Sequence, residues 1–210
     1  MKIKALGHAC FLLETAAGTR IVTDPFDASV GYDEPCVETD IVTASHGHYD
    51  HGNVEAPVGT KHVLIENCDV TIGDVHIYTV PCFHDPECGA LRGENLIFIY
   101  EADGVRVAHL GDLGHMLSDA QIAKLGALDA VLIPVGGTFT LDAKEAKALC
   151  DKLDVKKILP MHYQTARLTL GKTLADLADF TDQFETVEFA EDDIEVAADM
   201  PFGVLVPCLP

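Results

Sequence analysis

The amino-acid sequence predicts a layered α/β domain that extends over residues 1–210. A chain of 210 residues with 48% hydrophobic content is long enough to bury one substantial core. In the first half, short β-rich runs follow one another directly, which is typical of a meander of strands. In the second half, apolar strands alternate with helical patterns, which is typical of βαβ units packed on a sheet. We therefore expect one domain in which helices cover a sheet.

The first half is expected to consist of strands. Runs rich in β-branched and aromatic residues, bounded by turn residues, predict strands at residues 3–6, 11–14, 20–23, 41–44, 62–65, 70–72 and 75–80. Turns at Asn67 and at Gly73-Asp74 indicate that the last three of these strands form an antiparallel run. The acidic segment at residues 27–40 is either a flap over a site or a solvated surface loop.

The second half begins with a hairpin and continues with alternating elements. Residues 96–101 and 105–110 are β-rich runs joined by a tight turn at 102–104. The capping-box pattern at 118–121 starts a helix that ends near Gly126. Further elements are expected as a strand at 131–135, a helix from 142 to about 153, a strand at 157–160, a short helix at 173–180, and strands at 186–189 and 203–206.

The charge of the chain limits its partners. There are 14 basic residues against 34 acidic ones, which gives a formal net charge of −20. A protein that grips a nucleic-acid backbone or an anionic membrane needs lysine and arginine to neutralise phosphates, so neither is an expected partner. A small anionic substrate is not excluded, because a metal centre and one arginine can reverse the field inside a cleft. The sequence leaves open whether the chain forms a homo-oligomer.

Hydropathy and cysteine content predict a soluble, cytoplasmic protein. No apolar run approaches the roughly 20 residues that span a bilayer, and the first residues lead into a strand-like pattern without the long apolar segment of a signal peptide. The seven cysteines are scattered and form no Cys-x-x-Cys pair, so a disulfide framework is not expected. Most should be small buried hydrophobic residues, but Cys82 and Cys88 lie near a candidate ligand, and a metal or redox role is left open for them.

The most informative stretch is the segment at residues 45–53, which follows an apolar run. It carries four groups within six residues that can bind a transition metal: His46, His48, Asp50 and His51. Imidazole nitrogen and carboxylate oxygen suit zinc, iron or manganese, and the nearby Gly47 and Gly52 let the backbone turn tightly enough to aim several of these groups inward. A polar histidine-rich loop is the alternative, but the order His-x-His-x-Asp-His is more specific than a count of histidines.

This order of residues after an apolar strand resembles the signature of the metallo-β-lactamase superfamily. The resemblance implies a four-layer αββα sandwich that holds one or two metal ions; the pattern of strands and helices alone does not specify two stacked sheets. Four further stretches are similar to a small-hydrolase branch related to the L-ascorbate-6-phosphate lactonases: residues 7–11, 109–115, 134–138 and 160–163. The resemblance covers nearly the whole chain, but it leaves the substrate open.

The resemblance also implies the remaining metal ligands. His84, Asp112 and His162 each follow a predicted strand at a position where the superfamily places a ligand. One ion would take His46, His48 and His84, and the second Asp50, His51 and His162, with Asp112 and a hydroxide between them. Two divalent ions are thus expected, zinc first, with manganese or iron as alternatives.

Such a site predicts a metal-dependent hydrolase. Binding to a cation lowers the pKa of water toward neutrality, so a metal-bound hydroxide would attack an ester, lactone, thioester or phosphoester of a small molecule. The expected catalytic residues are Asp112, whose two oxygens can each face one cation, and Asp50, which would orient the hydroxide.

Six further residues are candidates for contacts around the metals or with substrate: Asp24, His8, Arg92, His109, His115 and Tyr163. Asp24 precedes proline and is expected to be extended, at a place where an aspartate of the superfamily supports the metal loop; an ordinary Asp-Pro turn is the alternative. Arg92 either holds a carboxylate or phosphate or pairs with Glu87 or Glu94. His8, His109 and His115 either approach the site or are core residues. Tyr163 would donate a hydrogen bond to an oxyanion, an expectation that rests only on its position next to His162.

Two other functions remain open at this point. One is a di-iron redox enzyme on the same scaffold, in which glutamate or aspartate typically replaces some histidines and a flavin domain is commonly attached. The other is a non-catalytic metal-binding or regulatory module, which would keep the ligands without turnover. A nuclease, as found in other branches, is disfavoured by the negative charge and by the missing nucleic-acid-binding insert.

Overall fold

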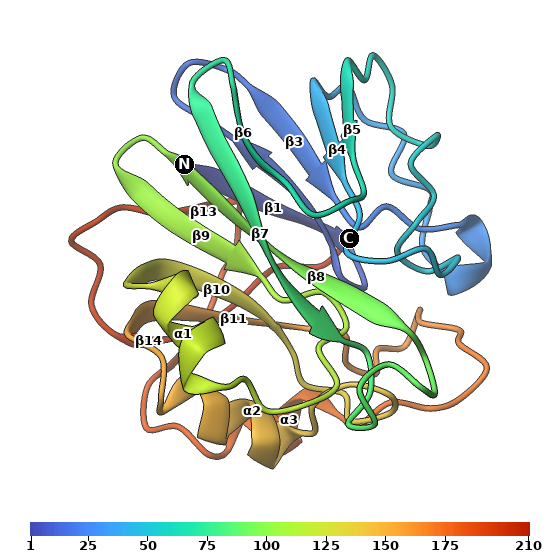
Figure 1. Ribbon diagram of the computed structural model, residues 1–210. Helices are drawn as coiled ribbons and strands as arrows, with labels where there is room; N and C mark the ends of the chain where they lie inside the picture. Colours follow the sequence, from blue (N-terminus) through green and yellow to red (C-terminus); the bar gives the residue numbers. More distant parts are fainter.

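Two β-sheets pack face to face in the computed structural model, which describes all residues, 1–210 (Figure 1). The six-stranded sheet has the strand order β13 (Ile194–Glu195), β1 (Lys2–Gly7), β2 (Cys10–Glu14), β3 (Arg20–Thr23), β4 (Ile41–Thr43), β5 (His62–Leu64). The eight-stranded sheet has the order β12 (Val187–Phe189), β14 (Gly203–Val206), β11 (Val155–Met161), β10 (Leu128–Pro134), β9 (Val105–His109), β8 (Glu94–Ala102), β7 (Val75–Phe83), β6 (Asp69–Ile72).

Successive side chains along a strand point to opposite faces of the sheet, so the eight-stranded sheet contributes to two separate apolar cores. In β8, Phe98 and Tyr100 point into the core between the sheets, whereas Ile97 and Ile99 point into the core on the other face. All seven residues of β10 are buried, because both faces of the eight-stranded sheet are covered.

Three short helices cover the outer face of the eight-stranded sheet, in the lower part of Figure 1. They are α1 (Asp119–Leu125), α2 (Ala143–Cys150) and α3 (Leu177–Thr181). Capping boxes start the first two, at Ser118 and at Asp142, so the free N–H groups of their first turns are satisfied. Leu125, Leu149 and Phe180 carry the apolar faces of these helices into the core against the sheet.

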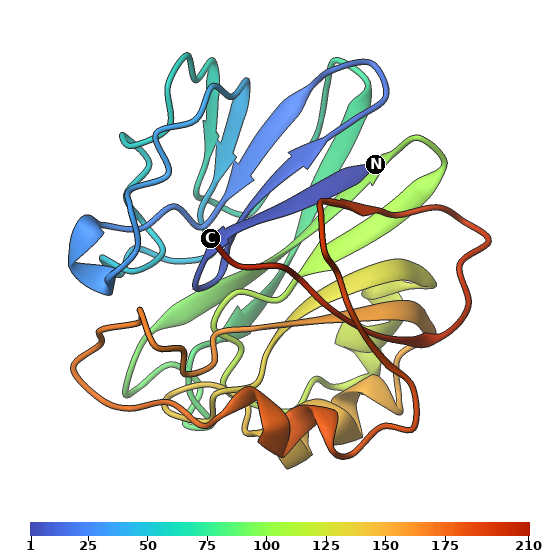
Figure 2. The same cartoon turned by 180° about the vertical axis from the view of Figure 1, so that it is seen from behind.

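The outer face of the six-stranded sheet is covered by irregular segments and one 3-10 helix, η1 (Ala28–Val30), which Figure 2 shows from behind. Cys10, Val22 and Val42 on this face belong to one apolar cluster with Phe26, Val30, Tyr32, Leu168 and Leu174. The sandwich therefore has its fourth layer, but that layer contains no long helix.

Strand directions determine where functional side chains can gather. In the six-stranded sheet, β1, β3 and β4 run in the same direction. In the eight-stranded sheet, β7, β9, β10 and β11 also share one direction. The segments that follow these strands therefore leave each sheet at one edge.

The structure confirms the α/β sandwich and most predicted elements, with four differences. β5 pairs parallel with β4 in the six-stranded sheet, so the prediction of an antiparallel run with β6 and β7 is wrong for this strand. The sequence of a short apolar strand does not indicate which of two sheets the strand belongs to. η1 and β13 were not predicted, and α3 begins at 177 rather than 173.

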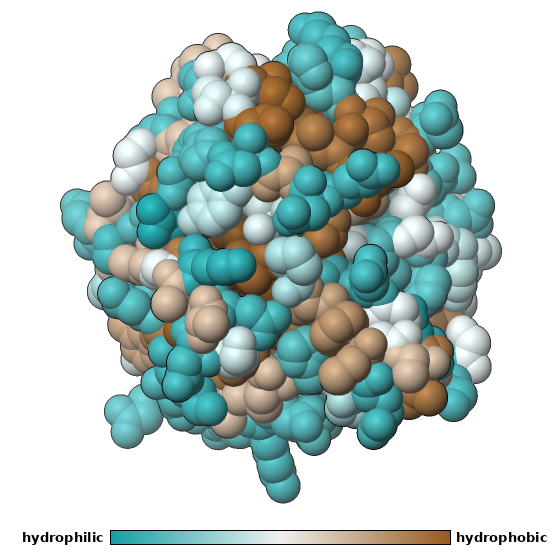
Figure 3. All heavy atoms as spheres, in the orientation of Figure 1, coloured by the Kyte–Doolittle hydropathy of each residue, from teal (hydrophilic) through white to brown (hydrophobic).

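The surface in Figure 3 is largely polar, as the charge predicts, with apolar side chains gathered near the top of the view over the strands of the six-stranded sheet. Val63 of the edge strand β5 and the adjacent Ile65 are among the exposed apolar side chains. None of the helices has the length and apolar character that a bilayer crossing requires.

We expect Phe98→Ala to lower the free energy of unfolding by about 3–5 kcal/mol, because it removes a fully buried ring from the core between the sheets. The matched control is Phe189→Ala on β12, where the ring is 67% exposed and the change should stay within about 0.5 kcal/mol. Urea unfolding of both variants measures the difference. Equal losses would contradict the assignment of Phe98 to the core.

Candidate metal centre

Six segments that follow strands converge at one edge of the sandwich. They come after β1, β3, β4, β7, β9 and β11 and bring together His8, Asp24, His46, His48, Asp50, His51, His84, Asp112 and His162. These residues lie up to 154 positions apart, from His8 to His162. The fold therefore assembles the cluster that the sequence shows only in part.

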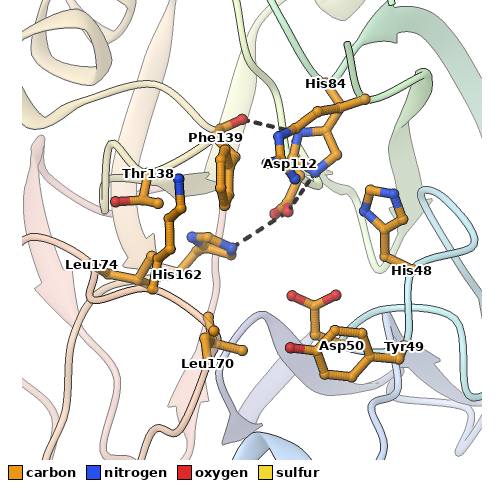
Figure 4. A pocket seen from close by; sticks show the side chains of 13 residues that line it. His48, Tyr49, Asp50, His84, Asp112, Thr138, Phe139, His162, Leu170 and Leu174 are labelled. Atoms are coloured by element: carbon orange, nitrogen blue, oxygen red, sulfur yellow. Dashed lines mark hydrogen bonds and ion pairs between the residues drawn. The ribbon is translucent and has the colours of Figure 1, made fainter.

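The Asp112 carboxylate lies at the centre of the cluster. Its Oδ2 is 3.1 Å from His84 Nε2 and 3.4 Å from His162 Nε2, and Figure 4 shows it between these two rings. His51 Nε2 lies 3.2 Å from Oδ1, and His46 Nε2 lies 3.9 Å from Oδ2. Both oxygens thus face imidazole nitrogens, which come from three different segments.

The donor atoms form three groups in which each atom lies within 4.8 Å of the others, one of them being Asp24, His46 and His51. Of the other two, one contains His46, His48 and His84, and the other contains His8, Asp50, His51 and His162. Asp50 Oδ2 is 3.6 Å from His8 Nε2 and 3.8 Å from His51 Nε2. The division matches the two predicted ligand sets, with His8 as an addition.

Asp24 fixes the orientation of the loop at residues 45–53. Its Oδ1 accepts a hydrogen bond from Ser45 N at 2.8 Å, and its Oδ2 accepts from the Ser45 hydroxyl and from His51 Nδ1 at 2.8 Å. The Ser45 oxygen in turn accepts from His46 Nδ1 at 3.0 Å. Because both histidines donate from Nδ1, each Nε2 presents a lone pair toward Asp112.

His84 and Asp112 are held in the same way. His84 Nδ1 donates to the carbonyl of Phe139 at 2.9 Å, which leaves its Nε2 toward Asp112. Asn95 accepts from the backbone N of Asp112 at 3.0 Å and donates to the carbonyl of Leu110 at 2.9 Å. Gly111 makes this approach possible, since a Cβ there would lie 2.4 Å from the Asn95 side chain.

Backbone strain is concentrated at this site. Six residues other than glycine have positive φ, and four of them belong to the site or to the pocket beside it: His8, Asp24, Phe139 and His162. Such conformations persist where the surrounding structure enforces them, typically at functional sites. The expected extended conformation of Asp24 is wrong, because its φ is +43° and its N–H is bonded to the carbonyl of Thr43.

The electrostatics favour a cation. Burial and the adjacent His51 lower the pKa of His46 to about 3, and burial together with His162 lowers the pKa of His8 to about 4. Burial alone would raise the pKa of Asp112, but His162 and His51 hold it well below its usual value. His46 and His8 are therefore neutral donors, whereas the carboxylates of Asp112 and Asp24 raise the pKa of His51, so its proton offsets the charge of Asp112 where a metal ion would otherwise do so.

All the buried side-chain nitrogen and oxygen atoms that lack a hydrogen-bond partner belong to this cluster. Six buried side-chain nitrogen or oxygen atoms have no hydrogen-bond partner: His8 Nδ1 and Nε2, His46 Nε2, His51 Nε2, Asp112 Oδ1 and His162 Nδ1. An unpaired buried polar atom costs about 1–3 kcal/mol, so six in one cluster call for a ligand. The donor set of imidazole and carboxylate fits divalent transition metals.

A pocket of about 380 Å³ opens beside the cluster. His48, Asp50, His84, Asp112 and His162 form one part of its lining (Figure 4). The rest includes residues that the sequence did not single out: Tyr49, Thr138, Phe139, Leu170, Gly171, Lys172 and Leu174. The Gly-Gly turn before Thr138 was a sequence signal, but nothing local marks Lys172 as a neighbour of the site.

The other predicted contacts have mixed outcomes. Arg92 lines the pocket, and it forms no ion pair with Glu87 or Glu94, so that alternative is wrong. Tyr163 is buried in the core beneath the helices, and burial raises its pKa to about 12, so the predicted oxyanion contact is wrong.

His109 and His115 are both hydrogen-bonded structural residues. His109 Nε2 donates to the carbonyl of Ala9 at 2.8 Å, and its Nδ1 accepts from Gly111 N at 3.1 Å. His115 accepts from Phe83 N at 3.1 Å and donates to the carbonyl of Met116, outside the pocket lining. Of the alternatives for these two residues, the structure favours satisfied histidines that hold strand ends in place.

The two cysteines with an open role and the acidic segment lie outside the pocket lining. Burial raises the pKa of Cys82 to about 12, and its thiol is bonded to Asn95, so it is not a thiolate ligand. Cys88 is exposed. Residues 27–40 are not a flap over the site: Val30 accepts from Thr169 N, so the segment supports the loop that carries Leu170 and Lys172.

Comparisons with known proteins point to one family. Residues 2–162 match the family model described as a beta-lactamase superfamily domain. A UPF0173 metal-dependent hydrolase of Methanoregula boonei is 31% identical over 191 residues, covering 79% of this chain and 83% of the relative, and one of Thermococcus kodakarensis is 32% identical over 195 residues, covering 79% and 85%. A crystal structure from Thermotoga maritima, described as a Zn-dependent hydrolase of the metallo-β-lactamase superfamily, is 39% identical, covers 100% of this chain and 99% of that chain, and has a TM-score of 0.82.

We expect Asp24→Asn to lower the free energy of unfolding by about 1–3 kcal/mol, because the amide NH₂ cannot accept from Ser45 or His51 and leaves a buried donor unpaired. Thermal and urea unfolding measure the loss. Asp154→Asn, at an exposed position, is the control and should change little. If the two variants were equally stable, Asp24 would not be the residue that holds the loop.

Proposed function

The chain belongs to the metallo-β-lactamase superfamily as a metal-dependent hydrolase, and we propose that it cleaves an ester, lactone, thioester or phosphoester of a small molecule at two divalent metal ions. The observation that carries the proposal is the set of six buried, unpaired donor atoms around Asp112. In addition, the Nε2 atoms of His46, His51, His84 and His162 lie 3.1–3.9 Å from the Asp112 oxygens, so imidazole and carboxylate donors converge on one small volume that an ion could share.

Each ion has its own group of donors in this proposal. His46, His48 and His84 would hold one ion, and Asp50, His51 and His162 the other, with the Asp112 carboxylate within reach of both groups. His8 would be a further donor to the second ion, because its Nε2 lies within 4.8 Å of all donors in that group. Imidazole-rich sites suit zinc, and the Thermotoga maritima protein is described as Zn-dependent; manganese and iron are the alternatives.

The protein residues would orient and polarise the reactants. Divalent cations at this position supply Lewis acidity, which polarises the electrophile of the substrate and makes water more acidic. Asp50 lines the pocket with 14% of its side chain exposed, so its carboxylate can orient the attacking water. Asp24, Ser45 and Asn95 keep the donors in fixed orientations, so that little reorganisation accompanies the reaction.

The size of the pocket limits the substrate to a small molecule. A volume of about 380 Å³ lies at the lower end of the range for ligand sites.

The other two expected functions have no comparable support. The donors comprise five or six histidines and two aspartates, without the glutamates expected of a di-iron redox site, and the relatives are described as hydrolases.

We expect Asp112→Ala to reduce bound metal from about two equivalents per chain to about one or fewer and to abolish hydrolysis, because it removes the carboxylate that faces both donor groups. Elemental analysis of purified protein measures the metal, and a screen of lactones, thioesters and phosphodiesters with defined metals measures activity. Asp192→Ala, at an exposed position, is the control. Full metal content together with full activity in Asp112→Ala would refute the dinuclear site.

We expect His8→Ala to weaken binding of the second metal about 10- to 100-fold while the first stays bound, because only the second donor group includes His8. Titration of the protein with zinc under a competing chelator resolves the two affinities without any activity assay. His62→Ala removes an exposed histidine of β5 and should leave both affinities unchanged. Two unchanged affinities in His8→Ala would show that its ring is not a ligand.

A further inference from the structure

Arg92 is an unneutralised cation in a strongly acidic protein. The chain has four arginines, and the other three pair with Glu14, Glu101 and Asp33. No carboxylate lies within 4.0 Å of the Arg92 guanidinium, and its side chain donates no hydrogen bond to the protein. With 34 acidic residues against 14 basic ones, a free arginine in a pocket is the exception.

A second cation stands beside it. The Arg92 guanidinium carbon lies 3.0 Å from the centroid of the Phe139 ring, and Lys172 Nζ lies 5.0 Å from the same centroid. Both side chains line the pocket that contains Asp112, and neither residue forms an ion pair. One aromatic ring therefore positions two positive charges at the pocket wall.

Arg92 is also fixed in place by its own loop. Asp85 accepts hydrogen bonds from four backbone N–H groups, of Glu87, Gly89, Leu91 and Arg92, the last at 2.7 Å. Burial alone would raise the pKa of Asp85, but these four donors lower it, so the carboxylate stays charged and the loop stays closed around it. The backbone that carries the guanidinium is thus already ordered, so binding of a ligand would cost little conformational entropy of this loop.

Phe139 connects this wall to the metal donors. Its carbonyl accepts from His84 Nδ1 at 2.9 Å, its φ is +75°, and Figure 4 shows its ring across the pocket from Tyr49 and Asp50. The same strained residue therefore orients a metal donor and carries the two cations. Leu170 and Leu174 supply an apolar wall to the same pocket.

A purely structural role for Arg92 explains less. Stacking on Phe139 accounts for one face of the guanidinium, but it leaves the N–H donors at its edge without an acceptor. Those donors match the two oxygens of a carboxylate or phosphate.

We propose that Arg92 and Lys172 bind an oxyanion, carboxylate or phosphate, on the substrate, at a distance from the bond that is hydrolysed. This inference rests on the proposed hydrolase function and specifies its substrate class: a small ester, lactone, thioester or phosphoester with a second, non-reacting anionic group. The C–O, C–S or P–O bond of the substrate breaks, the acyl or phosphoryl group takes the hydroxyl of one water, and the leaving oxygen or sulfur takes its other hydrogen. The bound oxyanion is unchanged in the reaction.

The first test is a calorimetric titration of the zinc-loaded full chain with inorganic phosphate and, separately, with acetate. We expect Arg92→Gln to weaken binding of the preferred probe about 10- to 150-fold and Lys172→Gln by a smaller factor, as for the loss of a charged hydrogen bond. Arg92→Lys keeps the charge and should lie between Arg92→Gln and the natural chain. Lys144→Gln, which removes a surface charge of α2, is the matched control and should have no effect.

The outcomes separate the two anions and the two proposals. A loss confined to phosphate assigns a phosphate-bearing substrate, and a loss confined to acetate assigns a carboxylate-bearing one. If the affinities for both probes are the same in the natural chain and in Arg92→Gln, the inference is overturned, whatever the enzyme hydrolyses. The titration needs no turnover, so an intact anion site in a protein that hydrolyses nothing would refute the hydrolase function alone.

For any ester that is hydrolysed, a matched pair of substrates gives a second test. The anionic substrates are 4-nitrophenyl hydrogen succinate and the 4-nitrophenyl ester of 3-phosphonopropionate, and the neutral one is 4-nitrophenyl acetate. We expect Arg92→Gln to lower kcat/KM for an anionic ester at least about 10-fold more than for the neutral ester. Equal losses for neutral and anionic esters would mean that Arg92 only supports the pocket, which would contradict the proposal.

Discussion

The buried carboxylate of Asp112 is the constraint on which the rest of the site depends. It lies in the interior with imidazoles on both oxygens, and one of those oxygens has no hydrogen-bond partner. An isolated charge in such a place is strongly unfavourable. The surrounding histidines reduce that cost, but they are themselves left with unpaired nitrogens. The whole cluster is therefore stable in a form that includes cations, and metal binding should be coupled to the stability of this edge of the sandwich.

The two-sheet core supplies the rigidity that the site needs. Four strained residues, His8, Asp24, Phe139 and His162, hold unfavourable backbone conformations in and around the cluster. Each follows a strand or sits in a loop tied to one by hydrogen bonds, and those strands are anchored by a fully buried apolar core. The strain can be maintained because a change in the backbone of any of these four residues would displace a strand of one of the two packed sheets.

The pocket of this strongly acidic protein is lined by two cations that form no ion pair, Arg92 and Lys172. The chain carries a net charge of −20, which should repel anions at long range. Arg92 and Lys172 line the same pocket as the metal donors, and bound cations would add positive charge there. On the proposal of an anion site, this arrangement would admit a small anionic ligand to the pocket, whereas a polyanion would meet the acidic outer surface.

The sequence by itself determined the strand pattern, the α/β class and the motif at residues 45–53, because these depend on local periodicity and on the order of neighbouring residues. Through the family resemblance it also pointed to His84, Asp112 and His162, which the structure brings to the same cluster. It missed Lys172 and Phe139 as pocket residues, misjudged Tyr163 and the backbone of Asp24, and placed β5 in the wrong run. Those features depend on which segments meet across the sandwich edge and on which face of a strand is covered, and only tertiary packing decides that.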